Sequence, residues 1–324
     1  EHDFVPVGPA NTDGLIIASP LHSRARSNYV QSLLAARHPI LFIGSGELGP
    51  AIVADNTGGI LDAMRHLIQH GHQQIAFIAG TREDMGGDSG DRLRAYQYAC
   101  QLYGLDKNPL LVAYGRHVYD GGYTAMQQII NSGAGFTAVL ASNDESALGA
   151  MQALKDAGWS IPKDAAVIGF DNRLDGAVHE PALSSIHVPL FNIGYRAVDL
   201  LLQHIGGKLE LTGTVKVDTR LVLRESCGCG VKAFLDQGHE ATSISQPLDP
   251  GKLKERLVKA IAPTVMNQTY WLTEDESFSF CQRLAETFAA GLQDGDSTAF
   301  RKTLDDVLRS TAASDENLHM WQDA

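Results

Sequence analysis

Several polar residues of this sequence lie at the end of an apolar run or at the start of the amphipathic stretch that follows it. They are Ser19 after LIIA, Asp91 and Arg92 at the start of a helical stretch, Asn143 and Asp144 after TAVLAS, and Asp171 and Asn172 after VIGF. In a parallel sheet covered by helices, ligands bind at the carboxyl ends of the strands. An arginine fork with carboxylates and amides suits the hydroxyls of a sugar or another small polar molecule. Together these residues predict a binding pocket, although Asp91 and Asn143 could equally be helix N-caps and Asp171 a turn residue.

A glycine-rich segment, GSGELG at 44–49, matches the dinucleotide fingerprint and follows a strand-like run. That fingerprint holds a pyrophosphate only when a helix starts there. PAIVAD follows instead, which is an extended pattern, so we interpret the segment as a loop and expect no cofactor. No nucleophile elbow, P-loop or nucleophile with an evident base is present, which favours binding over catalysis.

Two groups of residues have side chains that bind metals. His66 and His70 are spaced i, i+4, but with His72 they lie where a helix should end, and cationic side chains are favourable there without a metal. Cys227 and Cys229 flank one glycine and have no second pair at zinc-site spacing. We therefore expect small, partly buried thiols and no metal site.

Short β-branched apolar runs alternate with amphipathic stretches through the first 229 residues, a pattern typical of strands and crossover helices in a parallel sheet. The runs expected to be strands are 14–19, 39–44, 74–80, 110–115, 137–142 and 165–171. Each is almost continuously apolar, so helices should cover both faces of the sheet. We predict a doubly wound α/β fold.

Composition and charge exclude several classes of protein. The 324 residues, 44% of them hydrophobic, suffice for about two domains with a sizeable core. No apolar run approaches the roughly 20 residues of a membrane helix, and no secretory signal opens the sequence. The lack of a long apolar run predicts no membrane contact. A net charge of -12 has the wrong sign for binding phosphate backbones over a broad surface, so we expect no contact with nucleic acid by these residues. Four cysteines do not make a disulfide scaffold, which favours a cytoplasmic protein.

The composition changes near Gly230, because residues 1–229 hold 27 of the 32 glycines. Beyond that point Thr273 and Glu276 have the spacing of a capping box. A helical apolar stripe follows at Phe278, Cys281, Leu284, Ala285, Phe288 and Leu292. We expect a second helix near 297–311, and an earlier one from about Lys252 that ends at Pro263. Residues 230–324 are thus predicted to be an all-helical extension.

Five segments of the sequence carry a family pattern. They are DGLIIASP (13–20), the stretch 53–80, DRLRAYQYACQLYGL (91–105), the stretch 136–172, and PALSSIHVPLFNIGYRAVDLLL (181–202). In this order they resemble the ligand-sensing core of LacI/GalR-type regulators, which share the fold of periplasmic sugar-binding proteins. The ending RLVLRESCGC (220–229) is similar to the subgroup in which this sensor is joined to a signalling output such as a histidine kinase or a diguanylate cyclase.

The resemblance implies two lobes that hold a ligand between them. The first lobe would comprise about 1–80 and 189–206, and the second about 81–185 and 208–229. Chain crossings are expected at Ala79, Gly80 and Thr81, at His187 and Val188, and after Gly207. By position in the family motifs, Arg92, Asn143, Asp144 and Asp171 would contact ligand hydroxyls, and the edge-of-sheet argument adds Ser19.

The resemblance also implies a homodimer. The family's opening strand, helix and second strand have no counterpart before residue 13, so the first lobe is expected to be incomplete and ligand residues that the family places there are not named. We therefore expect a ligand-sensing regulatory domain for a sugar or related polyol, and no enzyme activity. The alternatives are a solute-binding protein of a transport system, an enzyme on the same fold, and a dimerising spacer with a decayed pocket. The helical extension favours signalling over transport.

Overall fold

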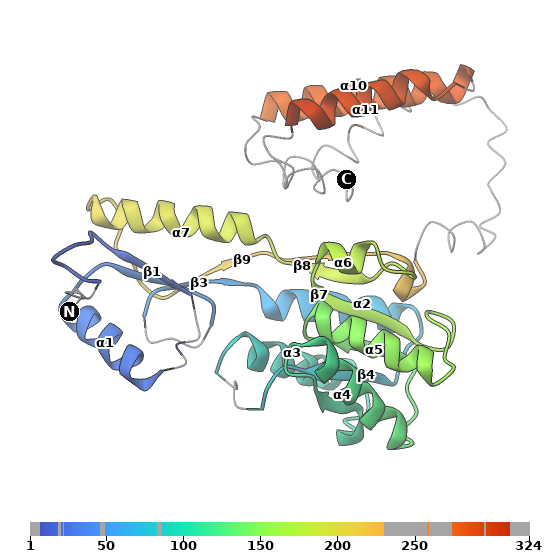
Figure 1. Cartoon of the computed structure of the whole chain (residues 1–324), viewed down its shortest axis with the longest axis horizontal. Helices are drawn as coiled ribbons and strands as arrows, with labels where there is room; N and C mark the ends of the chain where they lie inside the picture. Colours follow the sequence, from blue (N-terminus) through green and yellow to red (C-terminus); the bar gives the residue numbers. More distant parts are fainter. Residues whose placement is uncertain are drawn as a thin grey trace, which may run out of the picture. The chain divides into compact units, whose positions relative to one another are not determined.

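The apolar runs form two separate sheets within the first of two compact units, residues 1–237 (Figure 1). This computed structural model describes residues 7–18, 21, 23–45, 49–82, 86–229, 254, 258, 274–294 and 296–311. The predicted doubly wound α/β fold is confirmed, and each of the six expected strands is present.

The strands are β1 (Leu15–Ala18), β2 (Ile40–Ile43), β3 (Ala51–Ala54), β4 (Ile75–Ala79), β5 (Val112–Tyr114), β6 (Ala138–Ala141), β7 (Ala166–Asp171), β8 (Ser184–His187), β9 (Thr214–Val217) and β10 (Arg220–Val222). The helices of the first unit are α1 (Arg24–Ala35), α2 (Asn56–Gln69), α3 (Asp88–Leu102), α4 (Tyr119–Asn131), α5 (Asp144–Asp156), α6 (Leu174–Ala177) and α7 (Leu190–Ile205), with 3-10 turns η1 (Pro109–Leu111) and η2 (Glu225–Cys227).

The first lobe is a parallel sheet in the order β1-β2-β3-β9. Successive side chains of a strand point to opposite faces, and β2 shows this clearly. Ile40 and Phe42 pack with Val30 and Leu33 of α1. Leu41, on the other face, belongs to the same cluster as residues of α7. The two helices therefore cover opposite faces of the sheet.

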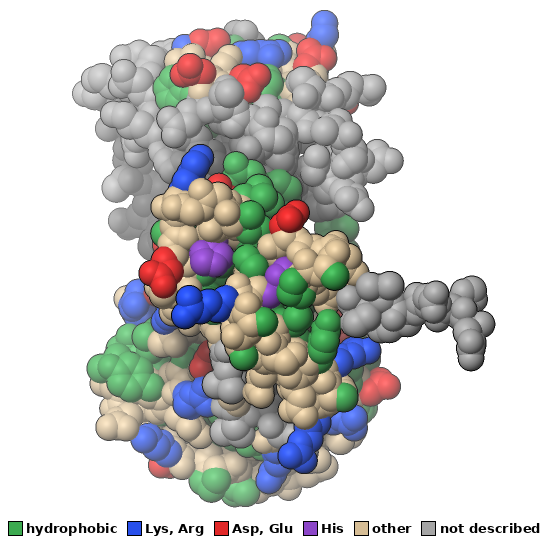
Figure 2. Space-filling view, turned by 90° about the vertical axis from the view of Figure 1, so that its left-hand side faces the viewer, with side chains coloured by type: hydrophobic (Ala, Val, Ile, Leu, Met, Phe, Trp, Pro, Cys, Tyr) green, Lys and Arg blue, Asp and Glu red, His purple; other side chains and the backbone are tan. Residues whose placement is uncertain are grey.

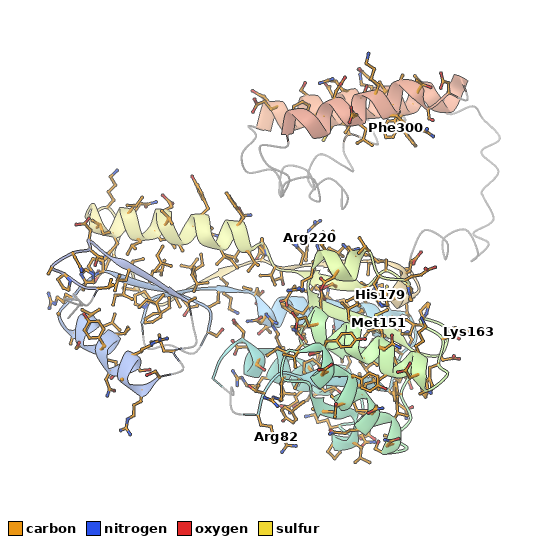
Figure 3. All side chains as sticks on the ribbon, in the orientation of Figure 1. Arg82, Met151, Lys163, His179, Arg220 and Phe300 are labelled. Atoms are coloured by element: carbon orange, nitrogen blue, oxygen red, sulfur yellow. The ribbon has the colours of Figure 1, made fainter. Side chains whose placement is uncertain are left out.

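The second lobe is a six-stranded sheet in the order β10-β8-β7-β6-β4-β5, parallel except for β10, which runs antiparallel to β8. On β4, Phe77 packs with α2 and α3, whereas the neighbouring Ile78 packs with α4 and α5. Met151 of α5 is almost fully buried on the second of these faces (Figure 3). This alternation accounts for the near-continuous apolar runs in the sequence.

The structure differs from the expected lobe boundaries at two places. β4 pairs with β5 and β6, so the chain enters the second lobe after β3, at Asp55, and residues 56–80 belong to that lobe. β9 pairs with β3, so the third crossing lies between Val217 and Arg220. In the sequence, the residues of β3 were recognised as extended but were not counted among the strands. A strand–helix–strand pattern in sequence is the same whether or not the chain passes to another sheet.

The second compact unit, residues 238–324, contains a pair of helices, α10 (Glu274–Asp294) and α11 (Thr298–Thr311). Cys281 and Val307 are fully buried between packed helices, and the rings of Phe288 and Phe300 meet edge to face with 5.4 Å between centroids. These helices match the predicted ranges. Of the expected helix from Lys252 to Pro263 the structure describes only Lys254 and Val258, both helical. Thr273 of the capping box and the side chain of Leu292 lie outside the described residues.

None of the described helices is long and apolar enough to cross a membrane. On the face shown in Figure 2, Lys and Arg side chains are separated by hydrophobic and uncharged ones. This view therefore shows no continuous basic patch.

Candidate functional site between the lobes

Arg92 lies in the second turn of α3 and is buried. Its Nε donates to Asn56 Oδ1 at 2.8 Å, and its Nη1 donates to the backbone oxygen of Ser142 at 2.6 Å. The guanidinium carbon lies 3.7 Å from the centroid of the Phe170 ring, and Nη1 lies 3.6 Å from Asp171 Oδ1. Burial lowers the pKa of Arg92, and Asp171 opposes this most strongly. The side chain thus joins the start of α2 to the ends of β6 and β7, so replacing it would cost stability as well as binding.

Asp171 ends β7 in a sharp turn of the backbone. It has φ +107° and Asn172 has φ +56°, values that non-glycine residues seldom adopt and that tend to occur at functional sites. The side chain of Asp171 is one third exposed while it faces Arg92. Burial raises the pKa of its carboxyl to about 6, and Arg92 opposes that rise. The carboxylate thus lies at the carboxyl edge of the sheet, where the sequence predicted it.

Asp144 is fully buried and has both carboxyl oxygens occupied within the lobe. Oδ1 accepts a hydrogen bond from Ser185 Oγ and Oδ2 accepts one from the backbone N of Arg173, each at 2.6 Å. Burial raises its pKa to about 7 in spite of these two bonds. A Cβ at Gly169 would lie 2.1 Å from Oδ1, so only glycine leaves room for this carboxyl. In the structure Asp144 thus anchors the turn after β7, and its contact with a ligand stays a prediction.

Asn143 is the N-cap of α5. From the sequence, this role was the alternative to a ligand contact. Its Oδ1 accepts from the backbone N of Ser146 at 3.1 Å, and its Nδ2 donates to the backbone oxygen of His117 at 3.0 Å. Both ends of the amide are thus used inside the lobe. Ser19 lies outside the described residues.

Ser45 connects the two lobes and was not among the predicted site residues. It follows β2 of the first lobe, and its Oγ lies 2.8 Å from Asp88 Oδ1 and 2.8 Å from Asp91 Oδ2 of α3. A hydroxyl has one proton, so it donates to only one of these carboxylates at a time. Asn56 Nδ2 also donates to Asp88 Oδ1, at 2.7 Å. The signal in the sequence was its position directly after a strand, the same rule that selected Asp171.

Six polar residues therefore meet where the lobes touch. We call them the interlobe cluster: Ser45, Asn56, Asp88, Asp91, Arg92 and Asp171. Three residues of the predicted pocket, Asp91, Arg92 and Asp171, belong to it. Asp144 lies nearby and accepts from the backbone N of Arg173, two residues after Asp171, whereas Asn143 caps α5.

The expected hinge residues fall into two groups. Ala79, Gly80 and Thr81 lie at the end of β4 inside the second lobe, and a Cβ at Gly80 would be 2.0 Å from both His117 Nε2 and Ser89 Oγ. Glycine there permits close packing, and the prediction of a crossing at these residues does not hold. His187 and Val188 lie where the chain passes from β8 to α7.

The first and third crossings are hydrogen-bonded to each other. Asp55 N donates to the backbone oxygen of Val217 at 2.8 Å, and Thr219 Oγ1 donates to the backbone oxygen of Asp55 at 3.0 Å. Arg220, the first residue of β10, follows this contact (Figure 3). Two of the connections between the lobes are thus held to each other by hydrogen bonds.

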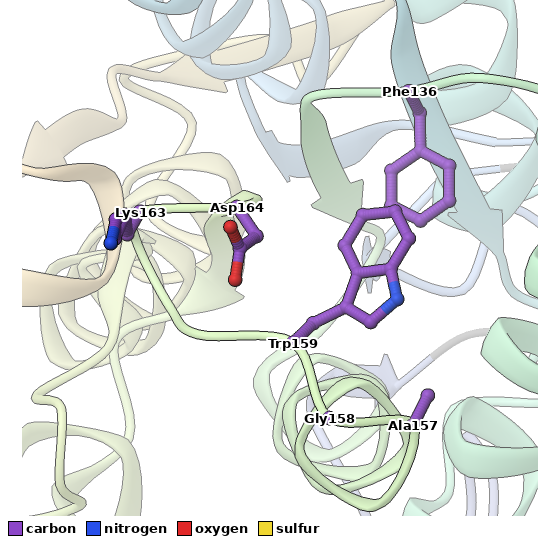
Figure 4. Close-up of a pocket in the computed structure, with 6 residues that line it drawn as sticks. All are labelled: Phe136, Ala157, Gly158, Trp159, Lys163 and Asp164. Carbon is purple, nitrogen blue, oxygen red and sulfur yellow. The ribbon is translucent and has the colours of Figure 1, made fainter.

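A separate pocket opens at the opposite end of the second sheet (Figure 4). It is lined by Phe136, Ala157, Gly158, Trp159, Lys163 and Asp164. These residues precede β6 and β7 or follow α5, so they lie at the amino ends of the strands. Phe136 stacks on Trp159 with 4.8 Å between centroids. Because ligands of doubly wound sheets bind at the carboxyl ends, this pocket is not part of the interlobe site.

The model of the periplasmic binding protein-like domain matches residues 64–227, half of the chain. The chain belongs to this family. The HTH-type transcriptional repressor PurR of Edwardsiella ictaluri is 34% identical over 230 residues, which cover 69% of this chain and 65% of that protein. Among solved structures, a complex of the transcriptional regulator CelR with cellobiose has a TM-score of 0.61 and 30% identity and covers 67% of each chain.

A lac repressor dimer bound to operator and the anti-inducer ONPF has a TM-score of 0.60 and 28% identity, covering 67% of this chain and 74% of that one. The comparisons confirm the predicted LacI/GalR-type ligand-binding core and support a ligand-sensing regulatory domain. The chain spans between half and about two thirds of the length of the curated relatives it matches.

Proposed function

We propose that residues 13–229 sense a small polar metabolite, a sugar or related polyol, by closing the two lobes on it. The observation that carries this proposal is the interlobe cluster, because Ser45 of the first lobe contacts Asp88 and Asp91 of the second. Residues from both lobes thus provide polar atoms at one place. A ligand that binds the closed arrangement more tightly than the open one shifts the equilibrium toward closure.

The charge of the interlobe cluster favours a neutral polyhydroxy ligand. Three carboxylates, of Asp88, Asp91 and Asp171, lie around the guanidinium of Arg92, and the guanidinium of Arg94 forms an ion pair with Asp91 at 2.6 Å, so carboxylates are in excess among these five groups. Carboxylate oxygens accept hydrogen bonds from hydroxyls, whereas a phosphate or carboxylate on the ligand would be repelled. Neutral sugars should therefore bind more tightly than sugar phosphates or sugar acids.

A homodimer is the second part of the proposal, supported by the surface of α7. Large apolar side chains are exposed along this helix at Leu190, Phe191, Tyr195, Val198, Leu202 and Ile205. An exposed apolar stripe of this kind is typical of protein–protein contacts. The lac repressor relative is a dimer.

We further propose that the domain acts in the cytoplasm, carries out no catalysis itself, and passes lobe closure to a transcriptional or signalling output. The relatives are transcriptional regulators, which supports this role over transport. The ending SCGC at 226–229 and the helices α10 and α11 are the features that favour a signalling output.

Thermal unfolding of the full chain tests the ligand class. The panel comprises cellobiose, common monosaccharides, polyols and nucleosides, each beside a phosphorylated or acidic counterpart. A ligand at 100 times its dissociation constant stabilises the folded state by about 2.7 kcal/mol. For a unit of this size that is a shift of roughly 5 to 10 °C. Calorimetry then measures affinity for the compound with the largest shift.

Asp171→Asn is the variant of choice, because Asp171 faces the cluster and is partly exposed, whereas Arg92 is buried in the fold. We expect this variant to lose at least tenfold in affinity. Asp106→Asn, an exposed residue outside the cluster, is the control and should bind as the parent does. Equal affinity of all three proteins would refute the site, and turnover of any compound would favour an enzyme.

A further inference from the structure

Two thiols and two imidazoles meet where the described part of the first unit ends. Cys229 Sγ lies 3.6 Å from His66 Nε2 and 3.5 Å from His70 Nε2. The ligand atoms of His66, Cys227 and Cys229 all lie within 4.8 Å of one another. We call His66, His70, Cys227 and Cys229 the Cys/His cluster. It lies outside the interlobe cluster, and the proposed function does not use it.

The last turn of α2 presents both imidazoles on one side. His66 and His70 are four residues apart, so they lie one above the other on the helix. Their ring centroids are 4.5 Å apart. Leu67, between them in the chain, is fully buried against the core, which fixes the rotation of the helix.

Core contacts fix the two thiols in place. Ser226 directly precedes the Cys-Gly-Cys turn and is fully buried. Its Oγ donates to the backbone oxygen of Val167 on β7 at 2.6 Å and accepts from the backbone N of Ser184 on β8 at 2.8 Å. Gly228 then has φ +88°, a left-handed conformation that glycine adopts without strain. The turn brings Cys227 and Cys229 to the same side, against α2.

The contacts of Cys229 with the two imidazoles have the length expected in a tetrahedral metal centre. With zinc–sulfur bonds of about 2.3 Å and zinc–nitrogen bonds of about 2.0 to 2.1 Å, tetrahedral angles place sulfur and nitrogen about 3.6 Å apart. Both sulfur–nitrogen distances at Cys229 are close to this value. Hydrogen bonds would also fit these distances, because the thiol can donate to one imidazole and accept from the N–H of the other, and the metal titration below distinguishes the two arrangements.

We propose that Cys227, Cys229, His66 and His70 bind one zinc ion or a similar soft divalent cation. Two cysteines and two histidines form an established ligand set for structural zinc, and soft thiolate donors select against magnesium and calcium. The ion would tie the end of the described core to α2, across 159 to 163 residues of sequence. The ion would thereby hold Cys229, the last described residue of this unit, against α2.

Cobalt and zinc titrations of the reduced, chelator-treated full chain test this proposal. Co²⁺ should bind in one equivalent, with the intense visible bands of a tetrahedral site and the near-ultraviolet charge-transfer absorption of thiolate ligands. Zn²⁺ should displace it. Loss of a residue that only supports a metal ligand costs roughly 10- to 100-fold in affinity, so Cys229→Ser should cost more than that.

His70→Ala keeps the test valid if the cysteine variants fold poorly, because His70 is exposed. Cys100→Ser and His72→Gln are matched controls, since Cys100 lies on α3 and His72 Nδ1 lies 3.0 Å from Thr137 Oγ1. The controls should bind metal as the parent does. Equal binding by His70→Ala and its control, a weak octahedral cobalt spectrum, or a Cys227–Cys229 disulfide that persists in reductant would overturn the proposal. None of these results depends on sugar binding.

Discussion

Replacing Asp144 by Asn should remove much of the pH dependence of the second lobe's stability. Asp144 is fully buried, and burial raises the pKa of its carboxyl to about 7. The protonated carboxyl can donate to Ser185 Oγ and still accept from the backbone N of Arg173. Asn offers the same pair of groups, with an NH2 toward Ser185 and an oxygen toward Arg173, but does not titrate.

The magnitude follows from the pKa difference between the folded and unfolded states. A shift from 3.8 to about 7 corresponds to about 4 kcal/mol, at about 1.36 kcal/mol per unit. Between these values the folded protein holds more protons than the unfolded chain, so the free energy of unfolding falls as pH rises. This stabilisation is complete below pH 4 and lost above pH 7. Asp171, with its pKa raised to about 6, adds a smaller contribution of the same sign because its side chain is one third exposed.

Urea unfolding at several pH values between 4.5 and 8 measures the effect. Trp159 stacks on Phe136 and reports on the second lobe, so its fluorescence is followed after Trp271 and Trp321 are changed to Phe. Differences between parent and variant cancel the titration of all other groups. The difference should change by about 3 kcal/mol in favour of the variant as the pH rises from 4.5 to 8, because part of the titration lies below pH 4.5.

Asp106→Asn is the matched control, since Asp106 is exposed, and its profile should run parallel to that of the parent. A constant difference between Asp144→Asn and the parent over the whole range would refute the reasoning. It would mean that Asp144 is ionised in the folded protein at every pH tested, stabilised by its two hydrogen bonds against the cost of burial.

Two further substitutions probe the packing that positions the sites. Ser226→Ala removes the hydroxyl that joins Ser184 N to the backbone oxygen of Val167. Because both groups are then left without this partner, the free energy of unfolding measured in urea should fall by about 1 to 3 kcal/mol. An unchanged urea midpoint would show that these groups find other partners. Gly122→Ala places a Cβ 2.2 Å from the backbone oxygen of Ser146, where α4 packs on α5. The resulting clash should lower the free energy of unfolding by about 1 to 3 kcal/mol in the same measurement. A gain in stability would show that the two helices can separate freely.

The sequence predicted most of the second lobe because its strands are buried on both faces. Val139 and Leu140 of β6, for example, are both fully buried, one on each face, which gives the unbroken apolar run. Ala51–Ala54 was recognised as extended but was not counted as a strand, because it is short and follows a glycine-rich loop. The crossing at Ala79 was implied by the family resemblance, and periodicity could not correct it because it does not show which sheet a strand joins.

The candidate site could be predicted only in part, because position along a strand does not determine burial. Asp144 and Asp171 follow neighbouring strands and have equal weight in the sequence. In the structure Asp144 is enclosed by Ser185 and the backbone of Arg173, whereas Asp171 reaches the edge of the lobe. The Cys/His cluster was not predicted because its two halves lie about 160 residues apart and each half, taken alone, has an ordinary explanation.

Helix α2 joins the two proposed sites physically. Its first residue, Asn56, bonds to both Arg92 and Asp88 of the interlobe cluster, and its last turn carries His66 to Cys229. At 1.5 Å per residue, its 14 residues span about 21 Å. A ligand that moves Asn56 relative to the core therefore acts on the same rigid element that a metal at the Cys/His cluster would hold.

Thermodynamic linkage makes this connection quantitative. If zinc changes the affinity for the sugar by some factor, the sugar must change the affinity for zinc by the same factor. An identical sugar affinity with and without bound zinc would show that α2 supports both sites but transmits nothing between them.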